Sequence, residues 1–355
     1  MNLKQGNPMI NLKENPFNEN EKALIIYHQV KPGIDCADGI TAAAIAKEAL
    51  EKKGYQADLL GCSYQSSFPG TQVQWEQYNE VYIVDFSFNR KELNIIKKSV
   101  PHVFLLDHHI GAFDSLKEDF EKESGVQIDD NRINRHHNLS YVSELGLQCI
   151  FHFNKSGSEI AWDYFNNNDG FHYKYLIQEK EGGYPGVVAY VGDRDTWKFR
   201  LPDSKKINFA LSELRHQLGG EVVYQQYKHL SSEELHNELI SLGTDIYQKR
   251  QNIICSMVDM YTCGTREGTT EVICVGEIPA KYGYLVSDIS EALYKKRDID
   301  FVVTYIKDEL GVNLRSRSGS GANVCAIAKQ FGGGGHYHAS GFKRSSIDEY
   351  PIRIG

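Results

Sequence analysis

The 355-residue sequence contains no apolar run that approaches the ~20 residues of a membrane-spanning helix. Its first stretch, MNLKQGNPMINLKENPFNENEK, is polar, is interrupted by Pro8 and Pro16, and lacks the apolar core of a secretory signal. We therefore expect no membrane partner, and we expect residues 1–21 to form a flexible leader.

Cysteine and positive charge are also scarce. The seven cysteines are an odd number without a CxxC pair, which indicates neither a disulfide framework nor a zinc knuckle, and a cytoplasmic location fits best. Lys and Arg number 39 against 47 Asp and Glu, so the chain lacks the basic excess of a protein that coats long nucleic acid. Short anionic ligands stay open, because a few local donors or metal ions can hold them.

Apolar runs alternate with helical patterns in the first part of the chain. The apolar runs cover residues 22–28, 57–64, 80–88 and 102–109, and the helical patterns between them cover residues 39–54 and 90–99. This order predicts an α/β fold whose parallel sheet carries helices on both faces. The carboxyl ends of the strands in such a sheet meet at one edge, where ligands bind.

The length of the chain predicts two domains. We expect the first domain to span residues 22–230, with a polar insertion at 113–150. Residues 231–258 have the pattern of a linker helix, and the alternation of strands and helices then starts again. Residues 259–355 are therefore expected to form a smaller α/β domain.

Acidic residues and histidines gather at the ends of the predicted elements. Five separate segments contribute them: His28, Asp35, Asp38, Asp85, Asp107, His108, His109, Asp193 and Asp195. Carboxylate oxygens and imidazole nitrogens without a set of thiolates suit Mn²⁺, Mg²⁺ or Fe²⁺ better than structural Zn²⁺. Two such ions bridged by one aspartate would activate a water molecule and neutralise a phosphate oxygen. The pattern predicts a hydrolase of phosphate esters.

Taken singly, these residues have ordinary explanations. Asp85 alone would be a helix cap or a turn residue, and His28 alone is as often a core imidazole as a ligand. Three strand ends with acidic residues or histidines, one of them Asp-His-His, favour a site. His136 and His137 have polar neighbours and no apolar strand, so we interpret them as exposed loop residues.

Four acidic motifs occur in a fixed order, namely YHQVKPGIDCADG, VDF, DHH and GDRDTW, and LRSRS and FGGGGHYHASGF follow in the second domain. In these motifs the chain resembles the DHH phosphoesterase superfamily, with a DHH domain and a DHH-associated C-terminal domain. The resemblance implies a phosphodiesterase or phosphatase with two Mn²⁺ ions, for which Mg²⁺, Fe²⁺ or Co²⁺ are alternatives.

The resemblance also implies roles for the individual residues. The implied metal ligands are His28 and Asp85 for the first ion, and Asp38, Asp85, His108 and one of Asp193 and Asp195 for the second. Asp107 would fix the orientation of an imidazole, and His109 would bind the scissile phosphate or protonate the leaving group. In the second domain, the residues implied to bind the far end of the substrate are Gly333, Gly334, Gly335, His336, Arg315 and Arg317.

Two positions in this scheme are open. Cys36 stands where the family has an aspartate. There are three alternatives: Asp35 turns toward the ion in its place, Cys36 itself binds the ion, or the first site is weak. A thiolate ligand would favour a softer ion than Mg²⁺. Asp193 and Asp195 are two residues apart and do not share a helix face, so only one should point at the metals. The other would cap the helix or pair with Arg194.

The sequence therefore predicts a metal-dependent phosphodiesterase for short single-stranded oligonucleotides or related small nucleotides. Alternatives are a cyclic-dinucleotide or 3′-phosphoadenosine-phosphate phosphohydrolase, and a nucleotide sensor without catalysis, because Cys36 removes one carboxylate. A pyrophosphatase is disfavoured by the GGGGH ending. The expected partner is a short single-stranded nucleic acid or a small nucleotide, and a homodimer is left open.

Overall fold

The computed structural model describes residues 21–64, 66–124, 138–142, 147–166, 183–317 and 322–355. Residues 1–20 of the expected leader, and His136 and His137, lie outside these ranges. Within the described ranges, no helix combines the length and the apolar character that crossing a membrane requires.

In the described part of the chain, the first sheet has seven strands. They are β1 (Lys22–Lys31), β2 (Ile34–Asp35), β3 (Gln56–Cys62), β4 (Glu80–Val84), β5 (His102–Asp107), β6 (Asn138–Val142) and β7 (Leu147–His152). The order is β2-β1-β4-β5-β7-β6, and β3 also pairs with β1. Strands β3, β1, β4, β5 and β7 are parallel, whereas β2 and β6 are antiparallel to their neighbours. The predicted α/β fold with a parallel sheet is confirmed.

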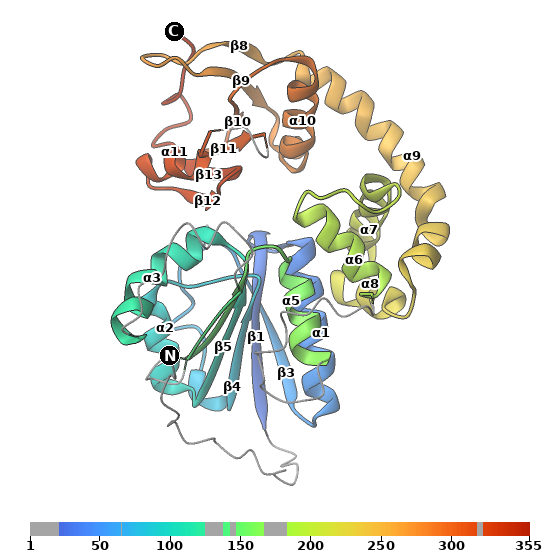
Figure 1. Ribbon diagram of the computed structural model, residues 1–355, viewed down its shortest axis with the longest axis vertical. Helices are drawn as coiled ribbons and strands as arrows, with labels where there is room; N and C mark the ends of the chain where they lie inside the picture. Colours follow the sequence, from blue (N-terminus) through green and yellow to red (C-terminus); the bar gives the residue numbers. More distant parts are fainter. Residues whose placement is uncertain (1–20, 65, 125–137, 143–146, 167–182, 318–321) are drawn as a thin grey trace, which may run out of the picture.

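Helices cover both faces of this sheet (Figure 1). Helices α1 (Ala37–Lys52) and α5 (Gly157–Asn166) pack on one face, and α2 (Arg90–Ser99) and α3 (Ile110–Ser124) pack on the other. Successive side chains of β1 belong to opposite faces, so Ile25 packs in the first core and Ile26 in the second. Because both faces are covered, the strands are continuously apolar, and such runs can be identified in the sequence.

Four further helices follow α5. They are α6 (Gly186–Asp195), α7 (Ser204–Leu218), α8 (Gly220–Tyr227) and α9 (Ser232–Val258). The long α9 runs from the first three of these to the second sheet (Figure 1). It begins with a capping box, in which the Ser231 hydroxyl accepts from the Glu234 N–H and the Glu234 carboxylate accepts from the Ser231 N–H. A helix is therefore present where we expected the linker.

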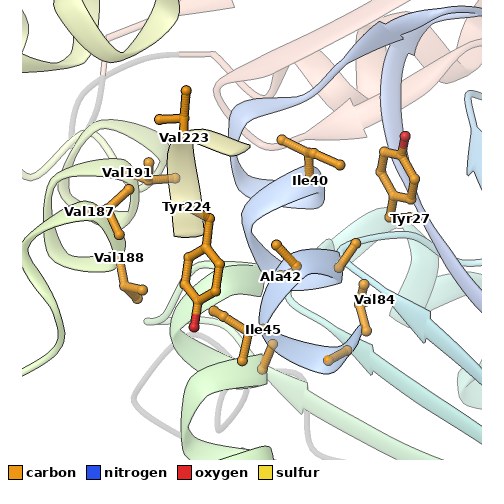
Figure 2. Close-up of a cluster of buried hydrophobic side chains, with 14 of the residues drawn as sticks. Tyr27, Ile40, Ala42, Ile45, Val84, Val187, Val188, Val191, Val223 and Tyr224 are labelled. Carbon is orange, nitrogen blue, oxygen red and sulfur yellow. The ribbon is translucent and has the colours of Figure 1, made fainter. Parts of the chain in front are cut away.

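Small side chains let α1 lie close to its neighbours. Ala42 and Ala46 of this helix are fully buried. Figure 2 shows the core around it, in which Ile40, Ala42 and Ile45 of α1 lie among Tyr27 and Val84 of the sheet, Val187, Val188 and Val191 of α6, and Val223 and Tyr224 of α8. The helix ends as predicted, because Gly54 follows it with a φ of 89°.

The expected polar insertion at 113–150 is wrong for its last part. Most of α3, β6 and the start of β7 fall in this range, and β7 pairs in parallel with β5. Leu147, Cys149, Ile150 and Phe151 are buried. The run LQCIFH is short and contains a glutamine, so it gave a weaker signal than the strands before it.

The second sheet has six strands within the described residues. They are β8 (Thr262–Thr265), β9 (Val272–Ile278), β10 (Phe301–Ile306), β11 (Gly311–Ser316), β12 (Gly334–His336) and β13 (Ala339–Lys343), in the order β12-β13-β11-β10-β9-β8. Helix α10 (Val286–Lys296) packs with α9 on one face, and α11 (Val324–Gln330) packs on the other. Short 3₁₀ turns occupy Trp75–Gln77 and Ala280–Leu285.

A disulfide joins Cys263 of β8 to Cys274 of β9. The two cysteines are directly opposite each other on antiparallel strands. The odd number of cysteines without a CxxC pair indicated no disulfide framework, and this expectation is wrong for Cys263 and Cys274, because the number and spacing of cysteines do not show which strands are neighbours.

An ion pair joins helix α6, beside the first sheet, to helix α10, beside the second sheet. Arg194 of α6 donates from two guanidinium nitrogens to the two carboxylate oxygens of Asp288 on α10, each over 3.0 Å. The Asp288 side chain is 4% exposed and that of Arg194 is 22% exposed. Lys205 of α7 pairs with Glu291 of α10 beside it. A largely buried bidentate pair of this kind fixes relative orientation as well as contributing energy.

We expect Asp288→Asn to lower the free energy of unfolding by about 1–3 kcal/mol. Removing one partner of a buried pair costs ~3–5 kcal/mol, and the partial exposure of Arg194 reduces that figure. Urea unfolding measures the change. Lys122→Ala is the matched control, because Lys122 and its partner Glu118 are 73% and 85% exposed and should contribute less than ~0.5 kcal/mol. Equal effects of the two substitutions would contradict a role for the Arg194–Asp288 pair.

Candidate metal centre

The strands β1, β4 and β5 bring three polar side chains to one edge of the first sheet. His28 lies near the end of β1, Asp85 directly follows β4, and Asp107 ends β5. Asp85 has a φ of 53°, and its N–H donates to the Leu106 carbonyl over 2.9 Å. Few non-glycine residues adopt this left-handed conformation, and those that do are concentrated at functional sites. Helix α5 can approach because Gly157 has no Cβ, which would lie 2.5 Å from the Asp85 Cβ.

Two helices bring further carboxylates to the same place. Asp38, in the first turn of α1, is fully buried and accepts hydrogen bonds from the N–H groups of Gly157 and Ser158 at the start of α5. Asp195 is the last residue of α6. These side chains therefore come together from β1, β4, β5, α1 and α6.

These carboxylates converge on Nε2 of His108. This nitrogen is 3.0 Å from Asp85 Oδ1, 3.5 Å from Asp195 Oδ2 and 3.9 Å from Asp38 Oδ2. Burial alone would lower the pKa of His108, but the contact with Asp85 and the negative charges of Asp195, Asp85 and Asp38 raise it well above its usual value. Burial and the charge of Asp38 raise the pKa of Asp195 well above its usual value. Ionisation of all three carboxylates around this one imidazole is therefore opposed unless a further cation is present.

Buried carboxylate oxygens in this cluster lack hydrogen-bond partners. Among the described residues, Oδ2 of Asp85, Oδ2 of Asp107 and Oδ2 of Asp195 are buried without a hydrogen-bond partner. An unpaired carboxylate oxygen in the interior is costly, and a cation removes the cost. The donor atoms also lie close enough to share ions, within 4.8 Å of one another in the sets Asp38, His108, Asp195; His28, Cys36, Asp85; and Asp85, Asp107, His108, His109. These residues fit a centre for divalent cations with Asp85 in two of the sets.

Asp107 holds the second histidine of the triplet. Its Oδ1 accepts from Nδ1 of His109 over 2.6 Å, and from the N–H groups of His108 and His109 over 2.7 and 3.2 Å. The His109 ring stacks on His336 of β12, with 4.4 Å between ring centroids. Burial and the neighbouring His109 lower the pKa of His336 well below its usual value. The structure thus brings the histidine after the glycine tract onto the Asp-His-His triplet.

The structure distinguishes Asp193 from Asp195, and Asp35 from Cys36. Oδ1 and Oδ2 of Asp193 accept from the N–H groups of Arg200 and Leu201 over 2.8 and 3.2 Å, so this side chain holds the loop after α6 and does not reach the cluster. Asp35 is exposed and lies outside the donor sets, whereas Cys36 belongs to one of them.

The two arginines expected at the substrate make other contacts. Arg315 donates from Nε to the Ser287 hydroxyl over 3.0 Å and from Nη1 to the Leu314 carbonyl over 2.9 Å. Arg317 donates from Nη2 to the Tyr294 carbonyl over 2.8 Å. Neither arginine is among the residues that line the cavity described next.

A cavity of about 1110 Å³ lies between the first sheet and the second. His109 and the glycines Gly333, Gly334 and Gly335 line it, whereas His336 is not among the lining residues. Sequence reasoning missed the other residues that matter here, which are the cations Lys329 and Lys343 and the aromatic residues Tyr64, Phe86 and Phe331. The Tyr64 ring centroid is 5.5 Å from that of His28 and 5.9 Å from that of His109. Tyr64 comes two residues after the end of β3. Functional side chains were sought at strand ends, where Asp85 was identified, and the same rule would have identified Tyr64.

No family model matches the chain. A relative in Acanthamoeba polyphaga mimivirus, the uncharacterized protein R106, is 24% identical over 359 residues, which cover 95% of this chain and 72% of the relative.

Among solved structures, a DHH domain from a member of a family of ribosomal proteins is similar, with a TM-score of 0.57 and 14% identity over 92% of this chain and 83% of that chain. The exonuclease RecJ bound to manganese has a TM-score of 0.47 and 13% identity over 92% of this chain and 86% of its own. A pGpG-specific phosphodiesterase, PggH from Vibrio cholerae, has a TM-score of 0.41 and 11% identity over 91% and 93%. The first of these similarities shows that the chain has the fold of that DHH domain, as the predicted resemblance implied.

The different surroundings of Asp193 and Asp195 predict opposite effects on the metal-free protein. Asp193→Ala should lower the free energy of unfolding by about 1–3 kcal/mol, because two backbone N–H groups lose their acceptor. Asp195→Asn should leave it unchanged or raise it, because it removes a carboxylate whose ionisation burial and Asp38 oppose. Thermal unfolding in the presence of a chelator measures both. A larger loss for Asp195→Asn than for Asp193→Ala would reverse the assignment.

Proposed function

We propose that this chain, which has the fold of a DHH domain, is a metal-dependent phosphodiesterase that hydrolyses short single-stranded oligonucleotides or related small nucleotides. The observation that carries the proposal is the convergence of Asp38, Asp85 and Asp195 on His108, with buried carboxylate oxygens that have no hydrogen-bond partner among the described residues. Such a cluster suits a pair of divalent cations of the Mn²⁺ type.

Each donor has a place in this proposal. His28 and Asp85 would hold the first ion, and Asp38, Asp85, His108 and Asp195 would hold the second, so that Asp85 would contribute to both. When bound, the two ions supply positive charge for the phosphate oxygens and a water molecule that ionises near neutral pH. The protein holds the donors rigidly, because Asp38 is fixed by the start of α5 and Asp85 by its backbone bond to Leu106.

His109 is the group that we propose to face the reacting phosphate. Its Nδ1 donates a hydrogen bond to Asp107, which fixes the orientation of the ring. Nε2 is then the ring nitrogen that can act on the substrate. The residue also lines the cavity between the two sheets. Nε2 in its protonated form would donate to a phosphate oxygen or give its proton to the leaving oxygen.

The cavity supports a short nucleotide substrate. Aromatic rings of Tyr64 and Phe86 lie at one wall, where a base can stack, and Lys329 and Lys343 supply cations for phosphates. The cavity volume of about 1110 Å³ is of the size that small-molecule sites have, and the chain has a formal net charge of −8. Both features favour a few nucleotides over a long polymer.

A nucleotide sensor without catalysis is the second candidate. It is favoured by Cys36, which takes the place of a carboxylate in the set with His28 and Asp85. A sensor would bind a labelled dinucleotide and leave it intact, whereas the enzyme would release mononucleotide. The same assay with cyclic dinucleotides and 3′-phosphoadenosine phosphate separates the alternative substrates.

Asp85→Ala should abolish the release of mononucleotide from a labelled dinucleotide in the presence of Mn²⁺. We expect a loss of at least ~100-fold, since even outer partners of metal ligands cost 10–100-fold. Chelation of the wild-type protein should have the same effect, and added Mn²⁺ should reverse it. His229→Ala, at an exposed position, is the control and should be fully active. Near-normal turnover by folded Asp85→Ala would remove the bridging role.

Tyr64 should act on binding and not on the chemical step. Tyr64→Ala should raise the KM for a dinucleotide by roughly 5–150-fold, because base stacking on an aromatic ring is worth about 1–3 kcal/mol. Tyr64→Phe keeps the ring and should retain the wild-type KM. Steady-state kinetics test the prediction, and it fails if kcat falls while KM is unchanged.

A further inference from the structure

We propose that Cys36 is a thiolate ligand of the first metal position, which makes this position a His–Cys–Asp set that selects a softer divalent ion than the second position does. The inference rests on the proposed two-metal function and deepens it. It decides between Asp35 and Cys36, which the sequence left open.

Asp35 is held away from the centre. Its Oδ1 accepts from the Tyr27 hydroxyl and from Nε2 of Gln29, each over 2.9 Å. Both partners are neighbours of His28 on β1, and successive side chains of a strand point to opposite faces. Asp35 is therefore fixed on the face of β1 opposite to His28. Its exposure also removes any need for a cation there.

Cys36 is held at the centre by the backbone. It is the N-cap residue of α1, has no capping hydrogen bond from its side chain, and donates its N–H to the His28 carbonyl over 3.3 Å. The first turn of α1 lies directly on β1 because Gly39 has no Cβ, which would be 2.5 Å from the same carbonyl. This close packing places the Cys36 sulfur within 4.8 Å of ligand atoms of His28 and Asp85.

A second observation points to a cation in this set. Oδ2 of Asp85 is buried without a hydrogen-bond partner among the described residues, and it lies 3.6 Å from Nδ1 of His28. Ligands about 2.0–2.3 Å from a tetrahedral ion lie roughly 3.5 Å apart, and the His28 nitrogen and the Asp85 oxygen already have this separation. The carboxylate oxygen, the imidazole nitrogen and the sulfur thus form a compact set with an unsatisfied anion in it.

Burial and the negative charges of Asp85, Asp195 and Asp38 raise the pKa of the Cys36 thiol well above its usual value. The sulfur would therefore give up its proton only when a cation binds, since metal binding to cysteine releases a proton.

The two metal positions differ in their donor atoms. The first combines sulfur, nitrogen and oxygen, whereas the second has the carboxylates of Asp38, Asp85 and Asp195 with one imidazole. Thiolates favour Zn²⁺, Co²⁺ or Fe²⁺, and carboxylates suit Mn²⁺ and Mg²⁺. The centre should therefore bind two unlike ions from a mixture.

The test is a Co²⁺ titration of the metal-free full-length protein under reducing conditions. A thiolate ligand gives a sulfur-to-cobalt charge-transfer band in the near ultraviolet, and we expect this band in the wild type and in Cys255→Ser, whose cysteine is exposed on α9. Cys36→Ser should lose the band and at least ~10-fold in affinity for the first Co²⁺. Cys36→Asp should lose the band and shift the preference toward Mn²⁺. Circular dichroism confirms that each variant is folded.

The outcomes separate this inference from the proposed function. A charge-transfer band that persists in Cys36→Ser overturns the assignment of Cys36. Visible Co²⁺ absorption in the wild type without the charge-transfer band also overturns it, but leaves the two-metal centre intact. A wild-type protein that binds neither Co²⁺ nor Mn²⁺ overturns both proposals.

Discussion

The mutual repulsion of carboxylates held in the protein interior is the constraint on which the rest of the site depends. Asp38 and Asp85 are buried and Asp195 is 28% exposed, and all three lie around the imidazole of His108. The fold tolerates this because each carboxylate is fixed by a structure that is stable for other reasons, such as the apolar strands before Asp85 and the alanine-rich helix that carries Asp38. The pocket of negative charge is thus a strained feature of a well-packed α/β core, and binding of cations would release the strain.

Much of the fold and the acidic half of the site could be predicted because both follow from local patterns. Strands covered on both faces are continuously apolar, so the run that ends at Asp85 and the run that ends at Asp107 were visible. Parallel pairing then brings their ends together without further information. The strand at 147–152 escaped because its run is short and polar at Gln148, and its place beside β5 depends on tertiary pairing.

The rest of the site depends on orientation, which residue types do not reveal. Asp193 and Asp195 have the same chemistry, and only the course of the loop after α6 shows that Asp193 is occupied by the N–H groups of Arg200 and Leu201. Arg315 was expected at the substrate because it is cationic and near the glycine tract in the sequence. In the structure its guanidinium binds within its own domain. The stacking of His336 on His109 could not be predicted, because it depends on how the second sheet is placed against the first.

The last turn of α6 connects the metal centre to the arrangement of the domains. Successive residues on a helix point about 100° apart, so Asp193, Arg194 and Asp195 reach three different surroundings. The first holds the following loop, the second binds Asp288 of the other domain, and the third lies beside His108. Because Arg194 and Asp195 are consecutive, the bidentate pair with Asp288 on α10 also holds the end of the helix that carries Asp195. One helix turn thus fixes a carboxylate of the cluster, the loop after α6 and the position of α10 together.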